Sequence, residues 1–364
     1  MSLNSERSGV ADGINRLPGQ ADDARLNACI AWLDTLSARV ELADLASYSI
    51  APASADASFR RYFRITTGAG RSFIVMDAPP PQENCRPFVR IATMMRAAGL
   101  NAPDVHAQDL DNGFLLLTDL GRHTYLDVLD ADNVDSLMRA ATDSLIRWQC
   151  ATQAGELPPY DEAVLRREIA LFPDWYVSRH LRTELTLAQR ETMEAVFSRV
   201  VQSNLAQKTV YVHRDFMPRN LMVSDESQGG LPGVLDFQDA LIGPIGYDIA
   251  CLWRDAFVSW EEERVLDGTV RYWEKAKKAG LPVPTDFGDF YRDVEWMALQ
   301  RHLKVLGIFA RINYRDGKPR YLTDTPRFVR YVRDTCRRYD ALAPLLHLFD
   351  ELHIGEATQY AVTF

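Results

Sequence analysis

Two neighbouring segments with apolar starts and polar ends constrain the fold of this chain more than any other part of its sequence. Residues 211–223 read YVHRDFMPRNLMV, and residues 233–236 read GVLD. The spacing H-R-D-x-x-x-x-N, followed by an aspartate after a second short strand, is the one that phosphoryl transfer uses. An isolated HRD triplet arises by chance, and a lone aspartate after an apolar run is usually a turn or a helix cap. The complete ordered set instead predicts Asp215 as the catalytic carboxylate. It also predicts Asn220 and Asp236 as Mg²⁺ ligands, because hard cations take oxygen ligands.

The length and charge of the chain limit its class. With 364 residues it is long for a single core, so two lobes are expected. Its 47% apolar and 25% charged residues are typical of globular proteins, and its net charge of −9 disfavours a role on nucleic acid or at a membrane surface. No apolar run approaches the roughly 18 residues of a membrane span, and the polar N-terminus lacks a signal sequence. The 5 cysteines are scattered, include no C-x-x-C pair and indicate reduced thiols. We expect a cytoplasmic protein that binds neither nucleic acid nor membranes, and we predict a monomer.

Apolar periodicity predicts an α+β fold with two lobes. Residues 1–21 are expected to be disordered, and residues 22–118 to form a small N-terminal nucleotide-binding lobe, a β-sheet with one helix between its strands. Its expected elements are an initial helix through Leu26, Ile30 and Leu33 capped by Asp22 or Asp23, strands at 58–65 and 72–76, a helix at 86–98, and strands near 105 and at 113–118. Residues 119–364 are expected to form a larger, mainly helical lobe that carries catalysis and substrate binding.

Further motifs place the chain close to a known family. It resembles the aminoglycoside-phosphotransferase-like family of small-molecule kinases in three segments, which read HRDFMPRN at 213–220, VLDFQDA at 234–240 and GPIGYDIA at 243–250. It is most similar to the amino-sugar kinases of that family in four others, which read SFRRYFR at 58–64, VMDAPP at 75–80, FPDWY at 172–176 and DIACLWRDA at 248–256. The resemblance, which covers residues 25–350, implies a bilobal protein-kinase-like fold with ATP and Mg²⁺ as cofactors. It also implies γ-phosphoryl transfer to the anomeric hydroxyl of N-acetylmuramate and N-acetylglucosamine, in peptidoglycan recycling.

Candidate ATP-binding residues lie in three places. The connector between the lobes offers the backbone of Thr118 and Leu120 to the adenine edge, an assignment that rests on architecture alone. Met222, two residues after Asn220, is placed to form the floor under adenine, and the alternative is a methionine of the core. The loop before the first strand pair supplies the remaining candidates, Ser58, Phe59, Arg60 and Arg61.

The sequence departs from the kinase pattern around these residues. The loop at 55–60 has alanines where glycines usually let the backbone approach phosphate. The strand at 74–77 reads IVMD and lacks the usual lysine, and the first lysine of the chain is Lys208. Any side-chain cation for the phosphates must then be an arginine, Arg60, Arg61 or Arg64, for which the alternative is a solvated strand surface. On the lysine-free strand, Asp77 is expected to pair with the following helix, through Arg86 or Arg90.

The acceptor is expected to be a small molecule, because a packed helix resumes soon after Asp236 and no A-P-E segment for peptide docking follows. Trp175, Tyr176 and Trp253 are candidate platforms for a sugar face, with core packing as the alternative. Arg254 and Asp255 are candidate partners for sugar hydroxyls. Residues 301–338 hold 11 Lys or Arg against 3 Asp or Glu, either as a solvated face or as an electropositive wall for an anionic acceptor, with Arg301 and Lys304 on one helix face. Structural roles are expected for His213 and Asp248.

The sequence therefore predicts an ATP- and Mg²⁺-dependent kinase of a small amino sugar. One rival keeps the chemistry and changes the acceptor to an amino alcohol, an aminoglycoside antibiotic or another sugar. The other rival is a nucleotide-binding pseudokinase. The missing lysine and glycines favour it, whereas the intact Asp215, Asn220 and Asp236 argue against it, since a protein that only binds nucleotide has no chemical need for all three.

Overall fold

The computed structural model describes residues 14–15, 23–54, 59–80, 82–224 and 230–355. The chain divides into two compact units. The N-terminal unit runs to Ala97 and takes up Asn101–Gly121, whereas the C-terminal unit comprises Ala98–Leu100 and the chain from Arg122 onward. Apart from residues 14 and 15, the predicted disordered tail lies outside the described residues. Within the described ranges, no helix is both long and apolar enough to cross a membrane.

The N-terminal unit is built on a six-stranded sheet with the strand order β1-β2-β3-β4-β6-β5. Its strands are β1 (Ile14–Asn15), β2 (Tyr48–Ser54), β3 (Arg61–Thr67), β4 (Ser72–Asp77), β5 (Val105–Asp109) and β6 (Phe114–Thr118). The β1–β2 pair is parallel, and the other neighbouring strands are antiparallel. In β3, alternate residues from Phe63 to Thr67 are buried, as expected for a strand that shows one face to a helix, whereas Val75, Met76 and Asp77 at the end of β4 are all buried.

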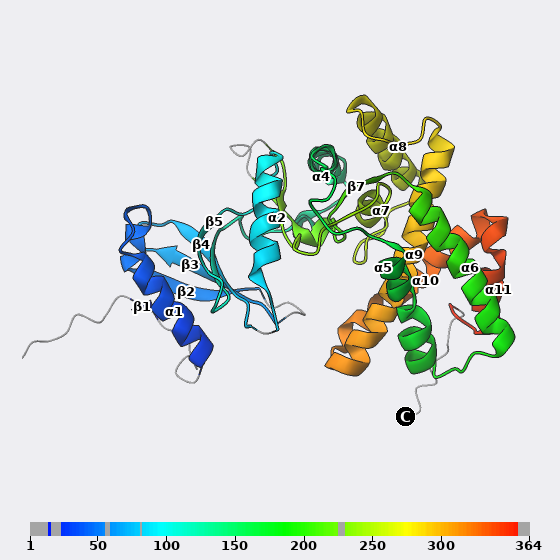
Figure 1. Cartoon of the computed structure of the whole chain (residues 1–364), viewed down its shortest axis with the longest axis horizontal. Helices are drawn as coiled ribbons and strands as arrows, with labels where there is room; N and C mark the ends of the chain where they lie inside the picture. The colour runs from blue at the N-terminus through cyan, green and yellow to red at the C-terminus, as the bar shows by residue number, and fades with distance from the viewer. Residues whose placement is uncertain (1–13, 16–22, 55–58, 81, 225–229, 356–364) are drawn as a thin grey trace, which may run out of the picture. The chain divides into compact units, whose positions relative to one another are not determined.

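Helix α1 (Ala24–Leu36) covers one face of this sheet. The carboxylate of Asp23 accepts the backbone N–H of Leu26 and so caps the helix. The buried side of α1 and the short helix η2 (Val40–Ala46) pack on strand residues that include Phe63 and Val75. The predicted apolar face of α1 is thus confirmed; Asp22, the other predicted cap, lies outside the described residues. Helix α2 (Cys85–Ala97) lies on the other side of the strands in Figure 1.

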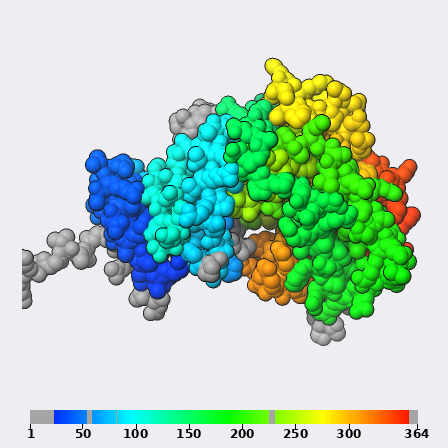
Figure 2. Space-filling view, viewed as in Figure 1, coloured from blue at the N-terminus to red at the C-terminus, as the bar shows by residue number. Residues whose placement is uncertain are grey.

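The C-terminal unit is mainly helical. Its longer helices are α4 (Val134–Cys150), α5 (Glu162–Ile169), η3 (Phe172–His180), α6 (Leu187–Ala206), α7 (Tyr247–Trp253), α8 (Glu262–Lys278), α9 (Phe287–Asp316), α10 (Thr325–Arg338) and α11 (Ala343–Glu351). Short helical segments are α3 (Tyr125–Val128), η4 (Pro218–Asn220), η6 (Pro319–Asp324) and η7 (Asp340–Leu342). Two small sheets pair β7 (Thr209–Val212) with β10 (Leu241–Pro244) and β8 (Leu221–Met222) with β9 (Gly233–Val234). In Figure 2, the green segments and the yellow α8 form much of the visible surface of this unit.

Helix α9 is the centre of the C-terminal unit, where α5, α6, α7, α10 and η3 all pack on it (Figure 1). At 1.5 Å per residue its 30 residues span about 45 Å. Gly307 lets the start of η3 approach closely, because a Cβ at this position would lie 2.3 Å from the backbone carbonyl of Leu171. The helix η3 that begins there has π geometry. Helices of this kind are rare in proteins, and those that occur often lie at functional sites. The centre of α9 is therefore enclosed on most sides, and its charged residues are buried with its apolar ones.

Candidate active site

The predicted catalytic and metal-binding residues lie together where β7 and β9 end. After β7 the chain turns through His213 to Asn220, and pairing of β8 with β9 brings the segment of Asp236 beside it. The backbone N–H of Leu235 donates to the carbonyl of Asn220 at 2.9 Å. The Nδ2 atom of Asn220 lies 2.9 Å from the carbonyl oxygen of Asp215 and 3.5 Å from Oδ2 of Asp236. The structure thus brings these three residues to one place.

The oxygens at this place suit a hard divalent cation. An amide side chain and a carboxylate, from Asn220 and Asp236, lie in contact and supply the neutral and anionic oxygens that Mg²⁺ binds. Among the described residues, no group of three or more His, Cys, Asp or Glu side chains could hold a metal by itself. A Mg²⁺ ion at this position would therefore complete its coordination with phosphate oxygens and water, as is usual for this ion.

Two non-glycine residues of the site have a left-handed backbone. Arg214 has φ +79° and Asp236 has φ +63°. Each such residue costs about 1–2 kcal/mol relative to ordinary backbone, and surrounding contacts must enforce it. The other non-glycine residues with positive φ in the described chain are Arg182 and His353. Strain of this kind gathers at functional sites because it aims side chains in directions that relaxed backbone does not offer.

His213 and Asp248 make the contacts of residues that hold the catalytic loop. The buried carboxylate of Asp248, on α7, accepts the backbone N–H of His213 at 2.7 Å and that of Arg214 at 3.0 Å. The N–H of Asp215 lies 3.3 Å from Nδ1 of His213, so Nε2 carries the proton and donates to the carbonyl of Leu235 at 3.0 Å. Burial lowers the pKa of His213 to about 4 and raises the pKa of Asp248 to about 7. A neutral histidine with both nitrogens engaged is a poor candidate for a base.

A cluster that the motifs did not signal holds the side chain of Arg214. The guanidinium of Arg214 binds the buried carboxylate of Glu168, on α5. The Nζ atom of Lys304 lies 3.0 Å from the same carboxylate, whose other oxygen accepts the hydroxyl of Tyr160. Lys304 also donates to the hydroxyl of Tyr247 at 3.2 Å. We name these five residues the Glu168 cluster. Its one trace in the sequence is a glutamate on the apolar face of α5, between Leu165 and Ile169.

Arg301 and Lys304 lie inside the unit, with 2% and 8% of their surface exposed. The expectation of a solvated face is therefore wrong at these two positions, because α9 is surrounded by other helices. Arg301 approaches the catalytic loop, with Nη2 3.8 Å from Sδ of Met217, and its buried Nη1 has no hydrogen-bond partner among the described residues. Burial alone would lower the pKa of Arg301, but nearby groups that include Asp215 and Asp255 raise it.

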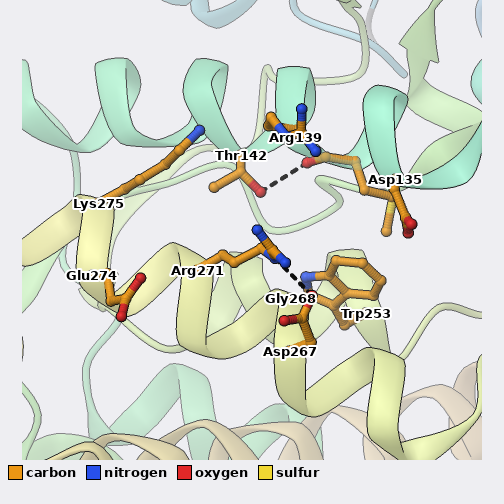
Figure 3. Close-up of a pocket in the computed structure, with 10 residues that line it drawn as sticks. Asp135, Arg139, Thr142, Trp253, Asp267, Gly268, Arg271, Glu274 and Lys275 are labelled. Atoms are coloured by element: carbon orange, nitrogen blue, oxygen red, sulfur yellow. Dashed lines mark hydrogen bonds and ion pairs between the residues drawn. The ribbon is translucent and has the colours of Figure 1, made fainter.

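The remaining predicted acceptor residues are engaged within the unit. Trp253 packs against Gly268 of α8, where an added Cβ would lie 2.0 Å from the indole. Figure 3 shows this indole beside Gly268 in a pocket lined by residues of α4, α7 and α8. Arg254 forms an ion pair with Glu262 at 2.8 Å. Asp255 accepts backbone N–H groups from the loop that follows it, those of residues 256–258.

The aromatic pair of η3 lies near the core of the unit. Tyr176 is buried and stacks on Phe172 with 5.6 Å between ring centroids. Trp175 is partly buried against the same core cluster. Core packing, the alternative reading of these residues, therefore accounts for Tyr176 and Trp253, and a sugar-binding role for any of the seven candidates stays a prediction.

In the N-terminal unit, Asp77 is fully buried and binds two arginines. Arg25 of α1 and Arg61 of β3 each place Nε 2.9 Å from a carboxylate oxygen of Asp77. Arg61 also binds Asp23, the cap of α1. The predicted pairing of Asp77 with Arg86 or Arg90 is wrong, because Asp77 points to the α1 side of the sheet. We name Asp23, Arg25, Arg61 and Asp77 the Asp77 cluster.

The other predicted ATP residues of this unit are placed as follows. Arg60 pairs with Glu83, just before α2, at 2.9 Å, and Arg64 pairs with Asp119 through Nε. The N–H of Thr118 donates to the carbonyl of Asp104 at 3.0 Å, which removes it as a free donor for adenine. Phe59 is 67% exposed and Leu120 is buried. Ser58 lies outside the described residues. Met222, in the C-terminal unit, is buried and paired with Gly233 in the β8–β9 sheet.

Comparison with known proteins identifies the class. The model of the phosphotransferase enzyme family matches residues 49–285, and the chain belongs to this family. It is 53% identical over 339 residues to an N-acetylmuramate/N-acetylglucosamine kinase of Pseudomonas aeruginosa, which covers 92% of this chain and 99% of that kinase. A kinase of the same name from Pseudomonas putida is 51% identical over 337 residues, or 92% of this chain and 98% of that protein. Among solved structures, an ethanolamine kinase of Plasmodium vivax has a TM-score of 0.60 at 9% identity, over 89% of this chain and 90% of that one. The predicted family and the α+β, protein-kinase-like fold class are confirmed.

Proposed function

We propose that this chain is an ATP-dependent kinase of N-acetylmuramate and N-acetylglucosamine. The observation that carries the acceptor is the 53% identity, over nearly the whole length of both chains, to a kinase of that name. The observation that supports the chemistry is the meeting of Asp215, Asn220 and Asp236 at one place. The phosphoryl group would pass to the anomeric hydroxyl, the product would serve peptidoglycan recycling, and the enzyme would act as a cytoplasmic monomer.

In the proposed mechanism the protein contributes mainly position and charge. Asp215 accepts, or at least orients, the proton of the acceptor hydroxyl, while Asn220 and Asp236 bind Mg²⁺. The ion supplies neutralisation of the negative charge that the phosphates carry. His213 and Asp248 keep the loop of Asp215 in place through the contacts described above. An anomeric hydroxyl is more acidic than an ordinary alcohol, which makes transfer of its proton to Asp215 easier.

For the missing lysine we propose Arg60 as the phosphate-binding cation. Arg61 is committed to the α1 side of the sheet by Asp23 and Asp77, and Arg64 is committed to Asp119. The pair of Arg60 with Glu83 links the start of the first strand pair to the start of α2, as a Lys–Glu pair links strand and helix in protein kinases. Replacing Arg60 by Met is expected to raise KM for ATP about tenfold and leave KM for the sugar unchanged. The same change at Arg71, which pairs with Asp44 on the surface, is the matched control.

The test of the proposed function is ADP release with Mg·ATP and a panel of acceptors. The panel contains N-acetylmuramate, N-acetylglucosamine, glucosamine, choline, homoserine and kanamycin, and phosphorus NMR locates the new phosphate. The proposal expects turnover on the two N-acetyl sugars, with an anomeric phosphate as product. Turnover on another panel member alone would retain the phosphotransferase and refute the acceptor. ATP binding without turnover on any acceptor would favour the pseudokinase.

A further inference from the structure

The side chain of Arg214 is held at several points. Its guanidinium binds Glu168, and its Nη1 atom donates to the carbonyl of Asp239 at 3.4 Å. The guanidinium carbon lies 5.7 Å from the ring centroid of Tyr160, which itself binds Glu168. These contacts join α5 to the catalytic loop and to the segment that follows Asp236.

The backbone of Arg214 is held as well. Its N–H donates to Asp248 at 3.0 Å, and its carbonyl accepts the thiol of Cys251 at 3.3 Å. This residue has the left-handed conformation and directly precedes Asp215, so a relaxation of its φ angle from +79° would turn the following peptide and redirect the Asp215 side chain. Contacts on both sides of the residue are therefore needed to keep Asp215 in one direction.

Glu168 is the member of the cluster on which the others depend. It is buried, and it accepts hydrogen bonds from one arginine, one lysine and one tyrosine. Burial opposes the ionised form, but the charges of Lys304 and Arg214 outweigh it and lower the pKa of Glu168. Loss of this carboxylate would leave both cations without their buried counter-charge, because a buried pair that loses one partner leaves the other charge uncompensated.

We propose that Glu168 is a positioning residue: by holding Arg214 in its left-handed conformation, it fixes the loop that presents Asp215 to the acceptor. This inference rests on the proposed function, and it adds a residue that no motif contains. Glu168 itself is buried beneath the loop and acts on the reaction only through Arg214. Its loss should therefore lower kcat and leave KM for ATP and for the sugar unchanged within about twofold.

The test compares two replacements of Glu168 in the full-length enzyme. In Glu168→Gln the shape is kept and the charge is lost, so kcat should fall about 100-fold, as expected for a misplacement near 1 Å. In Glu168→Asp the charge is kept on a shorter side chain, so kcat should stay within about tenfold of the wild type. A residue that only fills space would show the opposite order, because glutamine fills the site better than aspartate. The control is Glu162→Gln, which removes an exposed ion pair with Arg166 from the same helix and should leave kcat unchanged.

Two outcomes would overturn the proposal: Glu168→Gln with a kcat near that of the wild type, or Glu168→Asp no more active than Glu168→Gln. If Glu168→Gln does not fold by circular dichroism, Tyr160→Phe removes one hydrogen bond from the same carboxylate and should lower kcat about fivefold. An unchanged kcat in that folded variant would also refute the role of Glu168. An error in the acceptor assignment can be told apart from an error in the role of Glu168, because it would appear as absent turnover of the two N-acetyl sugars by the wild-type enzyme.

Discussion

The Asp77 and Glu168 clusters are alike at their centres and serve different parts of the molecule. Each holds a buried carboxylate between two cations. The cations of the Asp77 cluster come from α1 and β3, and those of the Glu168 cluster come from the catalytic loop and α9. The Asp77 cluster joins a helix to a sheet, and the arginines that close it are about one third exposed. The Glu168 cluster is enclosed, and one of its cations directly precedes Asp215.

The role of a buried ion pair therefore follows from the element to which its charges are attached. Loss of a pair between a helix and a sheet weakens the fold of that unit. Loss of a pair on a strained catalytic loop redirects a reactive side chain as well. The two clusters should therefore separate in experiment, one by stability and the other by turnover.

The largest loss of kcat is expected from a change at Asp215 itself. The Glu168 cluster acts through Asp215, so its loss can lower kcat no further than the loss of Asp215 does. Asp215→Asn removes the carboxylate that we propose assists the acceptor hydroxyl, and kcat is expected to fall about 10³-fold. The free energy of unfolding should change by less than about 0.5 kcal/mol, since Asp215 is only partly buried. Steady-state kinetics and urea unfolding measure the two quantities. Near-full turnover of this variant would remove the catalytic role of Asp215 and with it the purpose of the cluster.

His213 should lower the stability of the protein in acid, a contribution that the raised pKa of Asp248 opposes. Its pKa of about 4 lies below the ordinary value of 6.5, so between these values the unfolded chain binds a proton that the folded chain does not. Stability therefore falls as the pH drops from 6.5 to 4, by about 3 kcal/mol for this group. His213→Gln should abolish this share of the pH dependence, as seen in the difference between urea unfolding curves of wild type and variant. Identical pH dependence in both proteins would contradict the assignment.

The Asp77 cluster should respond in stability alone. Asp77→Asn leaves Arg25 and Arg61 without their buried carboxylate and is expected to destabilise the protein by about 2 kcal/mol. This value is below that of a fully enclosed pair because both arginines reach solvent. The folded variant should keep its kcat within about twofold. Asp44→Asn, which removes the more exposed pair with Arg71, is the control and should cost about 0.5 kcal/mol. A large loss of kcat in Asp77→Asn would end the distinction between the clusters.

The smallest changes in stability and kcat are expected when one cation is removed from each cluster. Arg25→Met should destabilise the protein by about 1 kcal/mol and leave kcat unchanged, because Arg61 still neutralises Asp77. Lys304→Met should lower kcat about tenfold with unchanged KM for either sugar. Kinetics with N-acetylmuramate and N-acetylglucosamine would decide the second case. A selective rise of KM for N-acetylmuramate would instead make Lys304 a substrate-binding residue.

The sequence predicted the parts of the site that depend on local order. Asp215, Asn220 and Asp236 follow short apolar strands at fixed spacing, so pairing of β8 with β9 was enough to bring them together. The face of α1 was also predictable, since Leu26 and Leu33 recur at helical spacing. These features need no knowledge of how distant elements pack.

The partners of the buried charges could not be predicted, because they come from far along the chain. Arg25 is 52 residues from Asp77, and Glu168 is 46 residues from Arg214. The predicted partners of Asp77, Arg86 and Arg90, lie on the helix that follows it in the sequence, whereas Arg25 lies on α1. The charges of α9 were assigned to a surface because a helix with both apolar and charged residues on every side gives no periodic signal for burial.

The left-handed backbone at Arg214 and Asp236 has a consequence for attempts to make this protein resist heat. Glycine adopts such angles without penalty, so glycine at Asp236 would relieve strain in the folded chain, whereas glycine at Arg214 would also leave the buried Glu168 uncompensated. The gain at Asp236 would delete a side chain that the loop needs. A selection for thermal resistance alone is therefore expected to drift toward folded chains with impaired turnover, and a screen that scores phosphoryl transfer at every round would avoid that drift.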